Sequence, residues 1–352
     1  MVIDQLIHGA INERIFPGAV VRIRCGGRVV HRAAYGTTMY SDVGSRPVAE
    51  DDRFDLASLT KIFTATAALR LYDSGLLDLE REASYYLPGL AATDVRVRHL
   101  LSHCSGLELR LAPLCTAGAA ELRRAIWATR PVHPPGTQSA YSNINSLLLG
   151  EIVARLTEQS LDCAIDELVV RPLGMVCTSF CPPATLRAGI VPTEWDHTWR
   201  GGLIHGVVHD ESAYTLGGIA GHAGLFGSVD DLERLMRMWL EGGAWEGKQL
   251  LREATVARAV SDQTGTLRSA TGAALRGGLG WMLDRANFMG MAPLGSFGHT
   301  GFTGTAMVGV ASCGLTMVLL SNRTYPQRTP PPYRHHTVTA AVMDAALQEV
   351  CR

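Results

Sequence analysis

A serine and a lysine lie three residues apart in the stretch DLASLTKIFTA, residues 55–65. The chain carries its positive charge on arginine almost everywhere else, and its only other lysine is Lys248. A serine hydroxyl is a useful nucleophile only when a base removes its proton, and a lysine amine can be that base when burial lowers its pKa. Arginine cannot lose its proton in this way. Residues three apart share one face of a helix, so we expect Ser58 and Lys61 to face the same site.

Two further polar motifs follow along the chain. Tyr-Ser-Asn at 141–143 stands directly before an apolar helical pattern, and His-Thr-Gly at 299–301 stands in a strand pattern ahead of a hairpin. In order and spacing, the three elements resemble the serine β-lactamase and penicillin-binding-protein superfamily, in particular its branch of class C β-lactamases, DD-peptidases and esterases. The resemblance runs from FPGAVV near residue 16 to SNR at 321–323 and includes the phrases VRVRHLLSHCSGL and GHAGLFGSVDDL.

The resemblance implies a role for each residue of the first two motifs. Ser58 attacks a carbonyl carbon and forms an acyl-enzyme, while Lys61 accepts or steers its proton. Tyr141, as a phenolate or through its hydrogen bonds, passes the proton to the leaving group and later activates the attacking water. Asn143 either binds the amide of the acyl part or holds Lys61 in place. No Glu-x-x-Leu-Asn element like that of class A enzymes is found, which favours a mechanism centred on Tyr141.

The third motif is implied to line the substrate site. The backbone N–H groups of Ser58 and Phe302 would form an oxyanion hole, in which each donor stabilises the transition state by ~3 kcal/mol. Thr300 lies within this strand, and Gly301 suits an edge along which substrate lies closely. Most β-lactamases begin this motif with a lysine that binds the substrate carboxylate, whereas His299 is mostly neutral near its reference pKa of ~6.5. We therefore expect only weak attraction for a β-lactam carboxylate.

The acceptor of the acyl group is left open by these motifs. Water as acceptor makes an esterase, β-lactamase or carboxypeptidase, and an amine or alcohol makes a transacylase, of the kind found in antibiotic and other natural-product biosynthesis. The first residues show no apolar core of signal-peptide length, so we expect a cytoplasmic protein, away from peptidoglycan and β-lactams. With His299, this favours an esterase or acyltransferase acting on a small ester or amide over the alternatives, a DD-carboxypeptidase or a class C-like β-lactamase. A non-catalytic sensor or binding protein is disfavoured because the motifs are intact.

Several other side chains could contribute to the site. Trp195 and Trp199 lie in an expected loop, where they would line an acyl pocket or only pack as a lid. His209, Asp210 and His222 flank the glycine-rich segment 215–227 and are interpreted as hydrogen-bond anchors of that segment. The segment itself lacks the GKS or GKT ending of a phosphate loop and is interpreted as a tightly turning wall.

The cysteines are scattered and form no C-x-x-C pair, which indicates unpaired thiols in a reducing compartment. Pairs such as Cys177/Cys181, His99/His103 and His205/His209 raise the alternative of zinc. No four ligands share one neighbourhood in the sequence, so we expect neither a metal nor another cofactor.

The sequence predicts strands near both ends of the chain. AVVRIRC and RVVHRAAYG flank Gly26-Gly27, and their alternating β-branched residues around a Gly-Gly turn predict a hairpin. GTAMVGVAS and LTMVLLSNR flank Cys313-Gly314 and predict a second hairpin, preceded by short strands at 279–284 and 295–300. Terminal helices are expected at 3–14 and 334–350.

The middle of the chain is helical in pattern, with the periodic stretches KIFTATAALRLYDSG, VRVRHLLSH, AAELRRAIWATR, INSLLLGEIVARLTEQ and VDDLERLMRMWLEGG. We expect an α+β fold of β-lactamase/transpeptidase type, with one antiparallel sheet built from both chain termini, flanked by helices. Residues 1–65 and 270–352 would form this sheet domain and 66–269 a mostly helical inserted region, with the active site between them. The whole would be one catalytic domain, about 13–345.

Composition limits the partners. The chain of 352 residues is 47% hydrophobic and 18% charged, with a net charge of −1. It has no basic run of the kind that grips a phosphate backbone, and no stretch of the ~20 apolar residues that a membrane span needs. We therefore expect a small-molecule ester or amide as partner, with an amine acceptor as a further possibility, and neither nucleic acid nor membrane.

Overall fold

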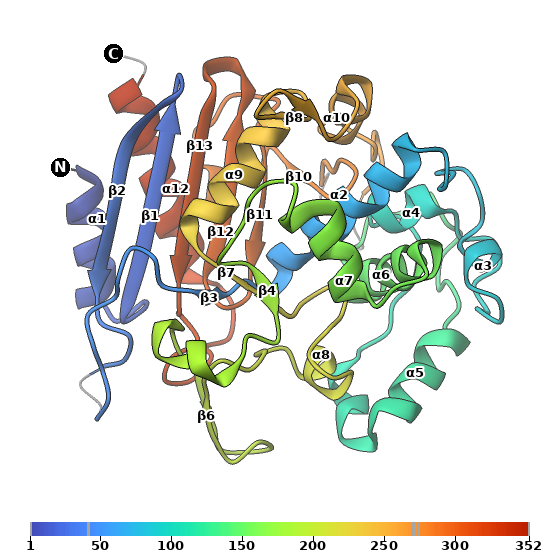
Figure 1. The fold of residues 1–352 in the computed structure, drawn as a ribbon, viewed down its shortest axis with the longest axis horizontal. Coiled ribbons are helices and arrows are strands. Elements are labelled where there is room, and N and C mark those ends of the chain that lie inside the picture. The colour runs from blue at the N-terminus through green and yellow to red at the C-terminus, as the bar shows by residue number, and fades with distance from the viewer. Residues whose placement is uncertain (1, 41–42, 269–271, 273–274, 351–352) are drawn as a thin grey trace.

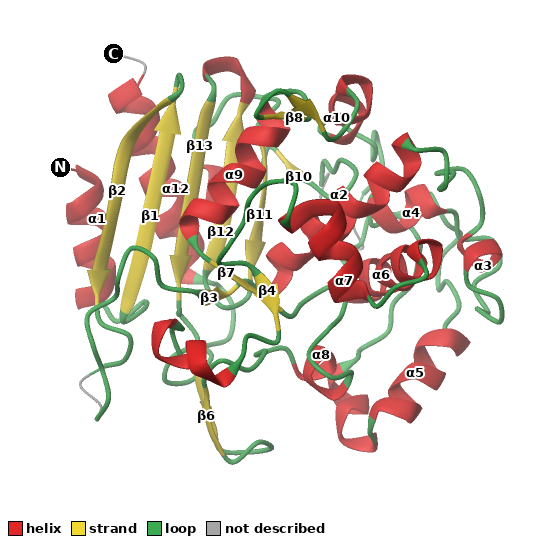
Figure 2. Cartoon of the chain, viewed as in Figure 1, coloured by secondary structure: helices red, strands yellow, loops and turns green. Residues whose placement is uncertain are grey.

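A six-stranded antiparallel sheet occupies one side of the molecule, and helices make up most of the other side (Figures 1 and 2). The computed structural model describes residues 2–40, 43–268, 272 and 275–350. The order of strands in the sheet is β10-β11-β12-β13-β1-β2. Their bounds are Gly18–Cys25 for β1, Arg28–Gly36 for β2, Met282–Leu283 for β10, Phe297–Gly301 for β11, Thr305–Val310 for β12 and Leu315–Ser321 for β13.

The two ends of the chain meet in the centre of this sheet. Strand β1 pairs antiparallel with β13, from Ala19 opposite Ser321 to Cys25 opposite Leu315. Both expected hairpins form, β1–β2 across Gly26-Gly27 and β12–β13 across a short 3₁₀ turn at Ala311–Cys313. The expected α+β fold, with one antiparallel sheet built from both termini, is confirmed.

Both faces of the sheet are buried, and alternate residues of one strand enter different cores. On β13, Met317 and Leu319 pack with the terminal helices, while Val318 and Leu320 belong to the larger core on the opposite face. Because side chains alternate across a strand, a strand that is buried on both faces is apolar throughout. This explains the nearly unbroken apolar run of LTMVLLS.

The terminal helices cover one face and an internal helix covers the other (Figure 1). Helices α1 (Val2–Asn12) and α12 (Arg334–Val350) pack together, with α11 (Ala286–Met289) against α12. Helix α9 (Val229–Leu240) crosses the opposite face and contacts β1, β12 and β13. Sequence analysis placed its stretch in the helical insert, whereas the structure lays it on the sheet, where buried Glu233 pairs with Arg24 of β1 at 2.6 Å.

The helical side is built around α2 (Thr60–Asp73), which is buried along nearly its whole length. Helix α6 (Asn143–Thr157) packs against α2 and against α4 (Val97–Leu101). The other helices are α3 (Ala83–Tyr86), α5 (Ala119–Ala128), α7 (Leu161–Ile165), α8 (Glu211–Thr215) and α10 (Glu253–Ala259). The short strands are β3 (Phe54–Asp55), β4 (Ser179–Phe180), β5 (Glu194–Asp196), β6 (Gly202–Ile204), β7 (Leu225–Gly227), β8 (Ala244–Trp245) and β9 (Lys248–Gln249).

Element boundaries differ from expectation where the backbone leaves regular geometry. The strand expected at 279–284 is reduced to Met282–Leu283, and Gly280 before it has φ +87°. The first helix ends at Asn12, since Arg14 already lies in the left-handed region with φ +55°. The boundary at 269–270 of the expected domains lies outside the described residues, and that division stays a prediction.

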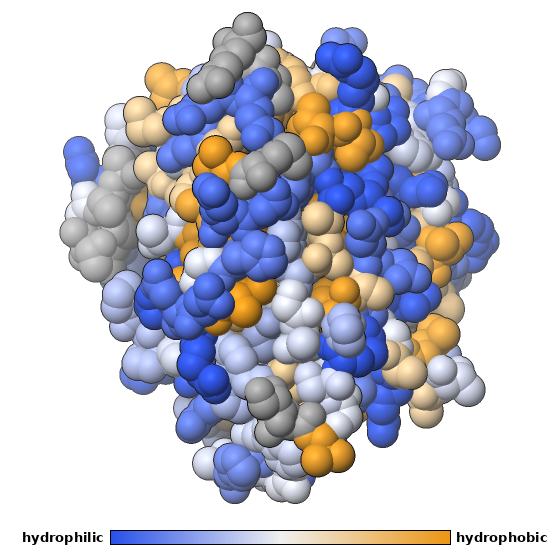
Figure 3. Space-filling model, turned by 90° about the vertical axis from the view of Figure 1, so that its left-hand side faces the viewer, coloured by the Kyte–Doolittle hydropathy of each residue, from blue (hydrophilic) through white to orange (hydrophobic). Residues whose placement is uncertain are grey.

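The face at the β2 edge is largely hydrophilic, with hydrophobic residues in small groups (Figure 3).

Candidate active site

Ser58 lies in a strained turn that leads into α2. The turn is a short 3₁₀ segment, Ala57–Leu59, and Ala57 has φ +45°, a region that L side chains rarely adopt. The buried carboxylate of Asp55 holds this turn, because it accepts from the N–H of Ala57 at 2.8 Å and from the N–H of His209 at 2.6 Å. The strain is therefore borne by a fixed network, as is common where a nucleophile must be presented.

Lys61 lies one helical turn later with its amine against the serine. Its Nζ donates to Ser58 Oγ at 2.8 Å and to the backbone carbonyl of His222 at 3.0 Å, and the side chain is 2% exposed. Burial lowers the pKa of Lys61 to about 7, and the charge of Asp210 opposes this only in part. Near neutral pH a large share of the amine is therefore unprotonated and able to accept the serine proton.

Tyr141 approaches the same oxygen from the cleft. Its hydroxyl donates to Ser58 Oγ at 2.9 Å, and Lys61 Nζ lies 5.1 Å from its ring centroid. The outer edge of the ring is open to the cleft, but burial around the hydroxyl raises the pKa of Tyr141, although the hydrogen bond to Ser58 opposes the rise. Of the two forms that the resemblance allows, the geometry therefore favours the neutral phenol.

Strand β11 lines the other side of the serine turn. A Cβ added to Gly301 would lie 2.6 Å from the carbonyl of Leu56 and 3.4 Å from Cβ of Ala57, so only glycine lets the strand approach so closely. The hydroxyl of Thr305 donates to that Leu56 carbonyl at 3.2 Å, and Thr303 donates to the Asp55 carbonyl at 2.7 Å. These bonds fix the third motif beside the nucleophile.

His299 is buried and neutral in this strand. It is 1% exposed, its Nδ1 lies 2.9 Å from the Thr300 carbonyl, and burial lowers its pKa to about 3. Its Nε2 has no hydrogen-bond partner among the described residues, and its ring lies 5.8 Å from that of Tyr141. The position where most β-lactamases carry a lysine thus provides no positive charge here.

Phe302 follows β11, and contacts with Arg323 and His209 fix its position. Arg323 Nε donates to its carbonyl at 2.7 Å, and the Arg323 guanidinium lies 4.3 Å from its ring centroid. The ring also stacks on His209 at 5.7 Å. The segment is therefore rigid beside the turn of Ser58, and the oxyanion role of the Ser58 and Phe302 N–H groups stays a prediction.

Asn143 begins α6 and lines a cleft together with Tyr141. The cleft holds about 840 Å³, and its lining also includes the charged side chains of Glu108, Arg110, Asp210 and Glu211. Among the hydrogen bonds of the described residues, none joins Asn143 to Lys61. The backbone carbonyl of His222 holds the amine instead, so the geometry favours a substrate-facing Asn143.

The glycine-rich wall and its anchors reach the lysine. Asp210 caps α8, accepts from Ser212 Oγ at 2.6 Å and lies 3.1 Å from Nε2 of His222, which is fully buried. Burial raises the pKa of Asp210, but the charge of His222 and these hydrogen bonds outweigh it and hold the pKa well below its usual range. Sequence analysis interpreted these residues as anchors of the wall, and it missed that the wall carries the carbonyl that binds Lys61.

His103 is a further residue at the site, and the sequence suggested it only as a possible zinc ligand paired with His99. Its ring centroid lies 4.8 Å from that of Tyr141, and its Nδ1 accepts from the Ser142 N–H at 3.3 Å and lies 3.1 Å from Asn145 Nδ2. Burial lowers its pKa to about 3, so the ring is neutral. It lies in the phrase VRVRHLLSHCSGL, which supported the family resemblance but gave no signal of a contact with Tyr141.

The tryptophans and the metal-ligand types lie elsewhere. Trp195 Nε1 donates to Tyr325 Oη at 3.3 Å and the ring of Trp199 meets Tyr214 edge to face at 5.5 Å, and neither lines the cleft. Across the described ranges, no three His, Cys, Asp or Glu side chains are grouped to hold a metal ion. No disulfide joins two cysteines within those ranges, and Cys351 lies outside them. Each helix that the structure describes is too short or too polar to cross a membrane.

Comparison with known proteins points to one family. The model of the Beta-lactamase family matches residues 3–340. A protein of Escherichia coli K12 named "Putative D-alanyl-D-alanine carboxypeptidase" is 31% identical, over 90% of this chain and 81% of that protein. A Bacillus subtilis protein named "N-acetylmuramyl-L-alanine amidase" is also 31% identical, over 91% of this chain and 80% of that protein.

Solved structures share the fold at lower identity. EstCE1, described as a hydrolase with promiscuous acyltransferase activity, has a TM-score of 0.76 at 22% identity and covers 97% of each chain. A mutant of simvastatin synthase from Aspergillus terreus has a TM-score of 0.74 at 21% identity, over 99% of this chain and 96% of that one. A class C β-lactamase reaches 0.75 at 22% identity, over 98% and 97%.

Proposed function

The chain belongs to the β-lactamase family, and we propose that it is a serine hydrolase that cleaves an ester or amide through an acyl-enzyme on Ser58. The observation that carries the proposal is the convergence on one serine oxygen. Lys61 Nζ lies 2.8 Å and Tyr141 Oη 2.9 Å from Ser58 Oγ, and the amine is buried with a pKa near 7. A serine with a neutral base on one side and a phenol on the other is equipped to gain and lose an acyl group.

In the proposed acylation, the Ser58 proton passes to the unprotonated amine of Lys61 as Oγ attacks the carbonyl carbon. The His222 carbonyl keeps one N–H of this amine occupied, so its lone pair is left for the serine. Tyr141 then gives its proton to the leaving oxygen or nitrogen, and the proton held on Lys61 restores the phenol. In deacylation, water is the nucleophile and the proton transfers run in reverse order, which releases the acid and the free serine.

The proposed substrate carries no carboxylate next to the acyl carbonyl. A substrate carboxylate in the usual position would meet the buried, neutral His299 rather than a lysine, and would gain little from it. This supports an ester or a neutral amide, with water or an amine or alcohol as the acceptor. EstCE1, which has the same fold, is described as a hydrolase that also has acyltransferase activity.

A second candidate is an amide bond in a cell-wall peptide. Two relatives at 31% identity are named for such bonds, and charged side chains line the cleft beside Tyr141. Glu108, an exposed acid on this lining, would pair with an amino group of such a peptide. Under this candidate Ser58 chemistry is the same and only the bond that is cleaved differs.

Intact-protein mass spectrometry tests the acyl-enzyme directly. With p-nitrophenyl butyrate we expect a covalent gain of one butyryl group that Ser58→Ala abolishes. Ser261→Ala, at an exposed serine, should acylate normally. If the adduct persists in Ser58→Ala, or no activated ester acylates the unmodified protein, the proposed function is wrong.

Product analysis separates the two candidates. A butyryl ester, a D-alanyl-D-alanine peptide and an N-acetylmuramyl-L-alanine amide are offered at equal concentration, and kcat/KM is compared. We expect the ester to lead by at least 10-fold, and an added amine to divert acyl groups from water. A lead by either amide would favour the second candidate.

A further inference from the structure

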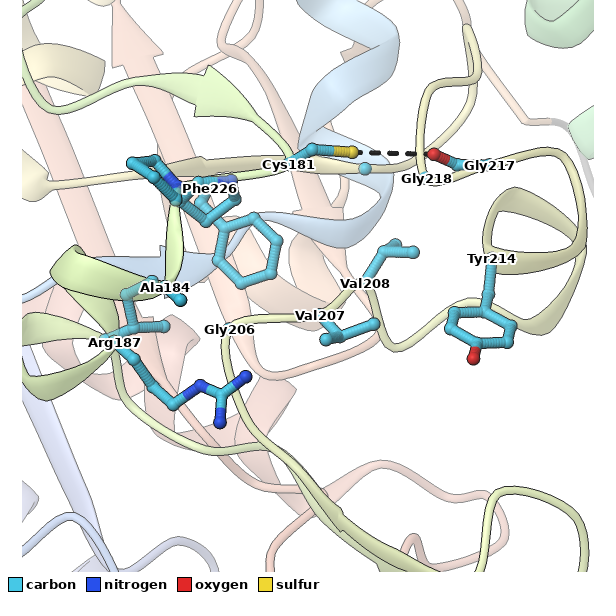
Figure 4. A pocket seen from close by; sticks show the side chains of 14 residues that line it. Cys181, Ala184, Arg187, Gly206, Val207, Val208, Tyr214, Gly217, Gly218 and Phe226 are labelled. Carbon is cyan, nitrogen blue, oxygen red and sulfur yellow. Dashed lines mark hydrogen bonds between the residues drawn. The ribbon is translucent and has the colours of Figure 1, made fainter.

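A second cavity lies behind the glycine-rich wall, apart from the cleft of Tyr141 (Figure 4). It holds about 390 Å³, within the range of ~300–1,000 Å³ typical of small-ligand sites. Its walls are the 3₁₀ turn at Ala184–Gly189, the loop at 206–208, the wall segment at 217–224 and Phe226 of β7. Neither Ser58, Lys61 nor Tyr141 is among its lining residues. We name it the wall pocket.

The wall pocket is separated from the cleft by α8 and the glycine-rich wall. Asp210, Glu211 and Ser212, at the start of α8, line the cleft, whereas Tyr214 and Gly217, at its end, line the wall pocket. The two cavities therefore present different surfaces to a ligand. A molecule in the wall pocket would not occupy the position of the acyl group on Ser58.

Backbone rather than side chains forms the inner side of the wall pocket. Gly218 and Gly224 both have positive φ, at +88° and +125°. A Cβ on Gly218 would lie 2.6 Å from Sγ of Cys181, and one on Gly224 would lie 2.3 Å from the Gly218 carbonyl. Larger residues at these two positions cannot be accommodated, so the wall stays thin beside the pocket.

The lining is largely apolar and carries one charge. Ile190, Val208 and Phe226 are buried side chains at the pocket, and Val207 stands at its side (Figure 4). Of the lining residues, all of which belong to the described part of the chain, only Arg187 is ionised. Its exposed guanidinium has no hydrogen-bond or ion-pair partner among the described residues.

Two other arginines, Arg46 and Arg53, contact the 3₁₀ turn that carries Arg187. Arg46 donates to the carbonyl of Ala188 in the same 3₁₀ turn and is itself paired with Asp52 at 2.6 Å. Arg53 Nε donates to the backbone carbonyl of Cys177 at 3.2 Å. An apolar cavity with a single free cation at its side is complementary to an apolar molecule that carries one negative charge.

We propose that the wall pocket binds a monocarboxylate with an apolar tail, the tail between Val208 and Phe226 and the carboxylate at Arg187. This ligand site is additional to the acyl site at Ser58 and does not depend on the proposed function. Cys181, whose Sγ donates to the Gly217 carbonyl at 3.5 Å, lines the same pocket and is exposed to solvent. Its thiol therefore reports on whether the pocket is occupied.

Protection of Cys181 from iodoacetamide tests the proposal with sodium octanoate as the probe. The rate of alkylation is followed by peptide mass spectrometry, and exposed Cys163, outside the wall pocket, serves as an internal reference. We expect octanoate to slow the alkylation of Cys181 at least 10-fold while Cys163 reacts as before. Octylamine, with the same tail and the opposite charge, should give no protection at the same concentration.

Two variants establish where the probe binds. Val207→Trp fills the cavity and Arg187→Glu reverses its charge, and both should reduce the affinity for octanoate at least 10-fold. Arg28→Glu makes the same change of charge at an exposed residue of the β1–β2 hairpin and should leave the protection unchanged. The proposal would be overturned if octanoate failed to protect Cys181 in the unmodified protein. It would also be overturned if the protection survived in both pocket variants. Acylation of Ser58 is measured separately, so a failure here does not bear on it.

Discussion

In the proposed mechanism, the protonation state of Lys61 decides whether Ser58 can react. The folded protein holds the pKa of this amine at about 7 against an ordinary value of 10.5, chiefly through burial. A protonated amine cannot accept the serine proton, so activity is lost as the pH falls through this value. We expect kcat/KM for a neutral ester to rise with pH and to level off above an inflection near 7.

Replacement by arginine separates a base from a mere positive charge. Lys61→Arg keeps a cation at the site but cannot release its proton, so we expect kcat/KM to fall by at least 10³-fold, within the range that removal of a general base produces. Lys248→Arg, at the exposed end of β9, is the matched control and should be fully active. Substantial activity of Lys61→Arg would mean that the lysine acts only through its charge.

Tyr141 is predicted to act through its hydroxyl proton. Tyr141→Phe removes the group that lies 2.9 Å from Ser58 Oγ and should lower kcat by about 10²–10⁴-fold, the usual contribution of a positioned acid or base. The folded state should be little affected, because the ring still packs against His103. Tyr85→Phe removes an exposed phenol and serves as the control. Equal activity in the two variants would contradict the proposed proton route.

At this scale the sequence predicted that Ser58 and Lys61 face one site, and the structure brings them together, but their environment was not predicted. Lysine at position 61 was informative because arginine replaces it elsewhere in the chain. The contact with the His222 carbonyl left no such signal, because every residue type supplies a backbone carbonyl. His103 approaches Tyr141 with its own backbone in the left-handed region, at φ +55°. The local sequence does not specify this conformation.

At the scale of elements, the glycine-rich wall contacts Lys61, α2 and α6 and so positions this lysine. Gly221 accepts from Thr64 Oγ1 of α2 at 2.8 Å through its carbonyl, and its neighbour His222 binds Lys61. A Cβ on Gly221 would lie 2.1 Å from the Ser146 carbonyl of α6, which cannot move without breaking the helix. The wall must therefore shift if this residue gains a side chain.

The prediction is that Gly221→Ala damages both stability and activity. We expect a loss of about 1–3 kcal/mol in the free energy of unfolding, as for other overpacked sites, and a reduced rate of Ser58 acylation. Gly202→Ala, in β6, meets no atom within 4 Å and has no positive φ, so it should change neither. Urea unfolding and acylation kinetics measure the two effects, and a fully active Gly221→Ala would show that the wall does not position Lys61.

Some elements were predictable and others were not, for physical reasons. The hairpins follow from alternating β-branched residues around Gly-Gly or Cys-Gly, and these signals are local. The position of α9 on the sheet involves long-range contacts, such as the pair of buried Glu233 with Arg24, and such partners have no signature in either segment. Helix α2 was predicted from the helical pattern of KIFTATAALRLYDSG, but that pattern did not indicate that the helix is buried on nearly every side.

At the scale of the whole molecule, acid should weaken the fold through histidines that are buried without charge. His99, His299 and His335 are 5% or less exposed. Burial lowers their pKa values to about 4, 3 and 2. In the unfolded chain these histidines take up protons near pH 6.5, whereas in the folded chain they stay unprotonated until the pH is much lower. Stability therefore falls as the pH drops below about 6.5, by about 2 kcal/mol for each such histidine at pH 5.

His335 in α12 offers the sharpest test, because burial lowers its pKa further than those of the other two histidines. Neither of its ring nitrogens has a hydrogen-bond partner among the described residues, so an apolar side chain loses no bond there. His335→Leu should leave the free energy of unfolding nearly unchanged at pH 7.5 and raise it by about 2 kcal/mol relative to the unmodified protein at pH 5. His197→Leu, at an exposed site, should show no such difference between the two pH values. Parallel pH profiles for His335→Leu and the unmodified protein would mean that this ring is not held neutral by the fold.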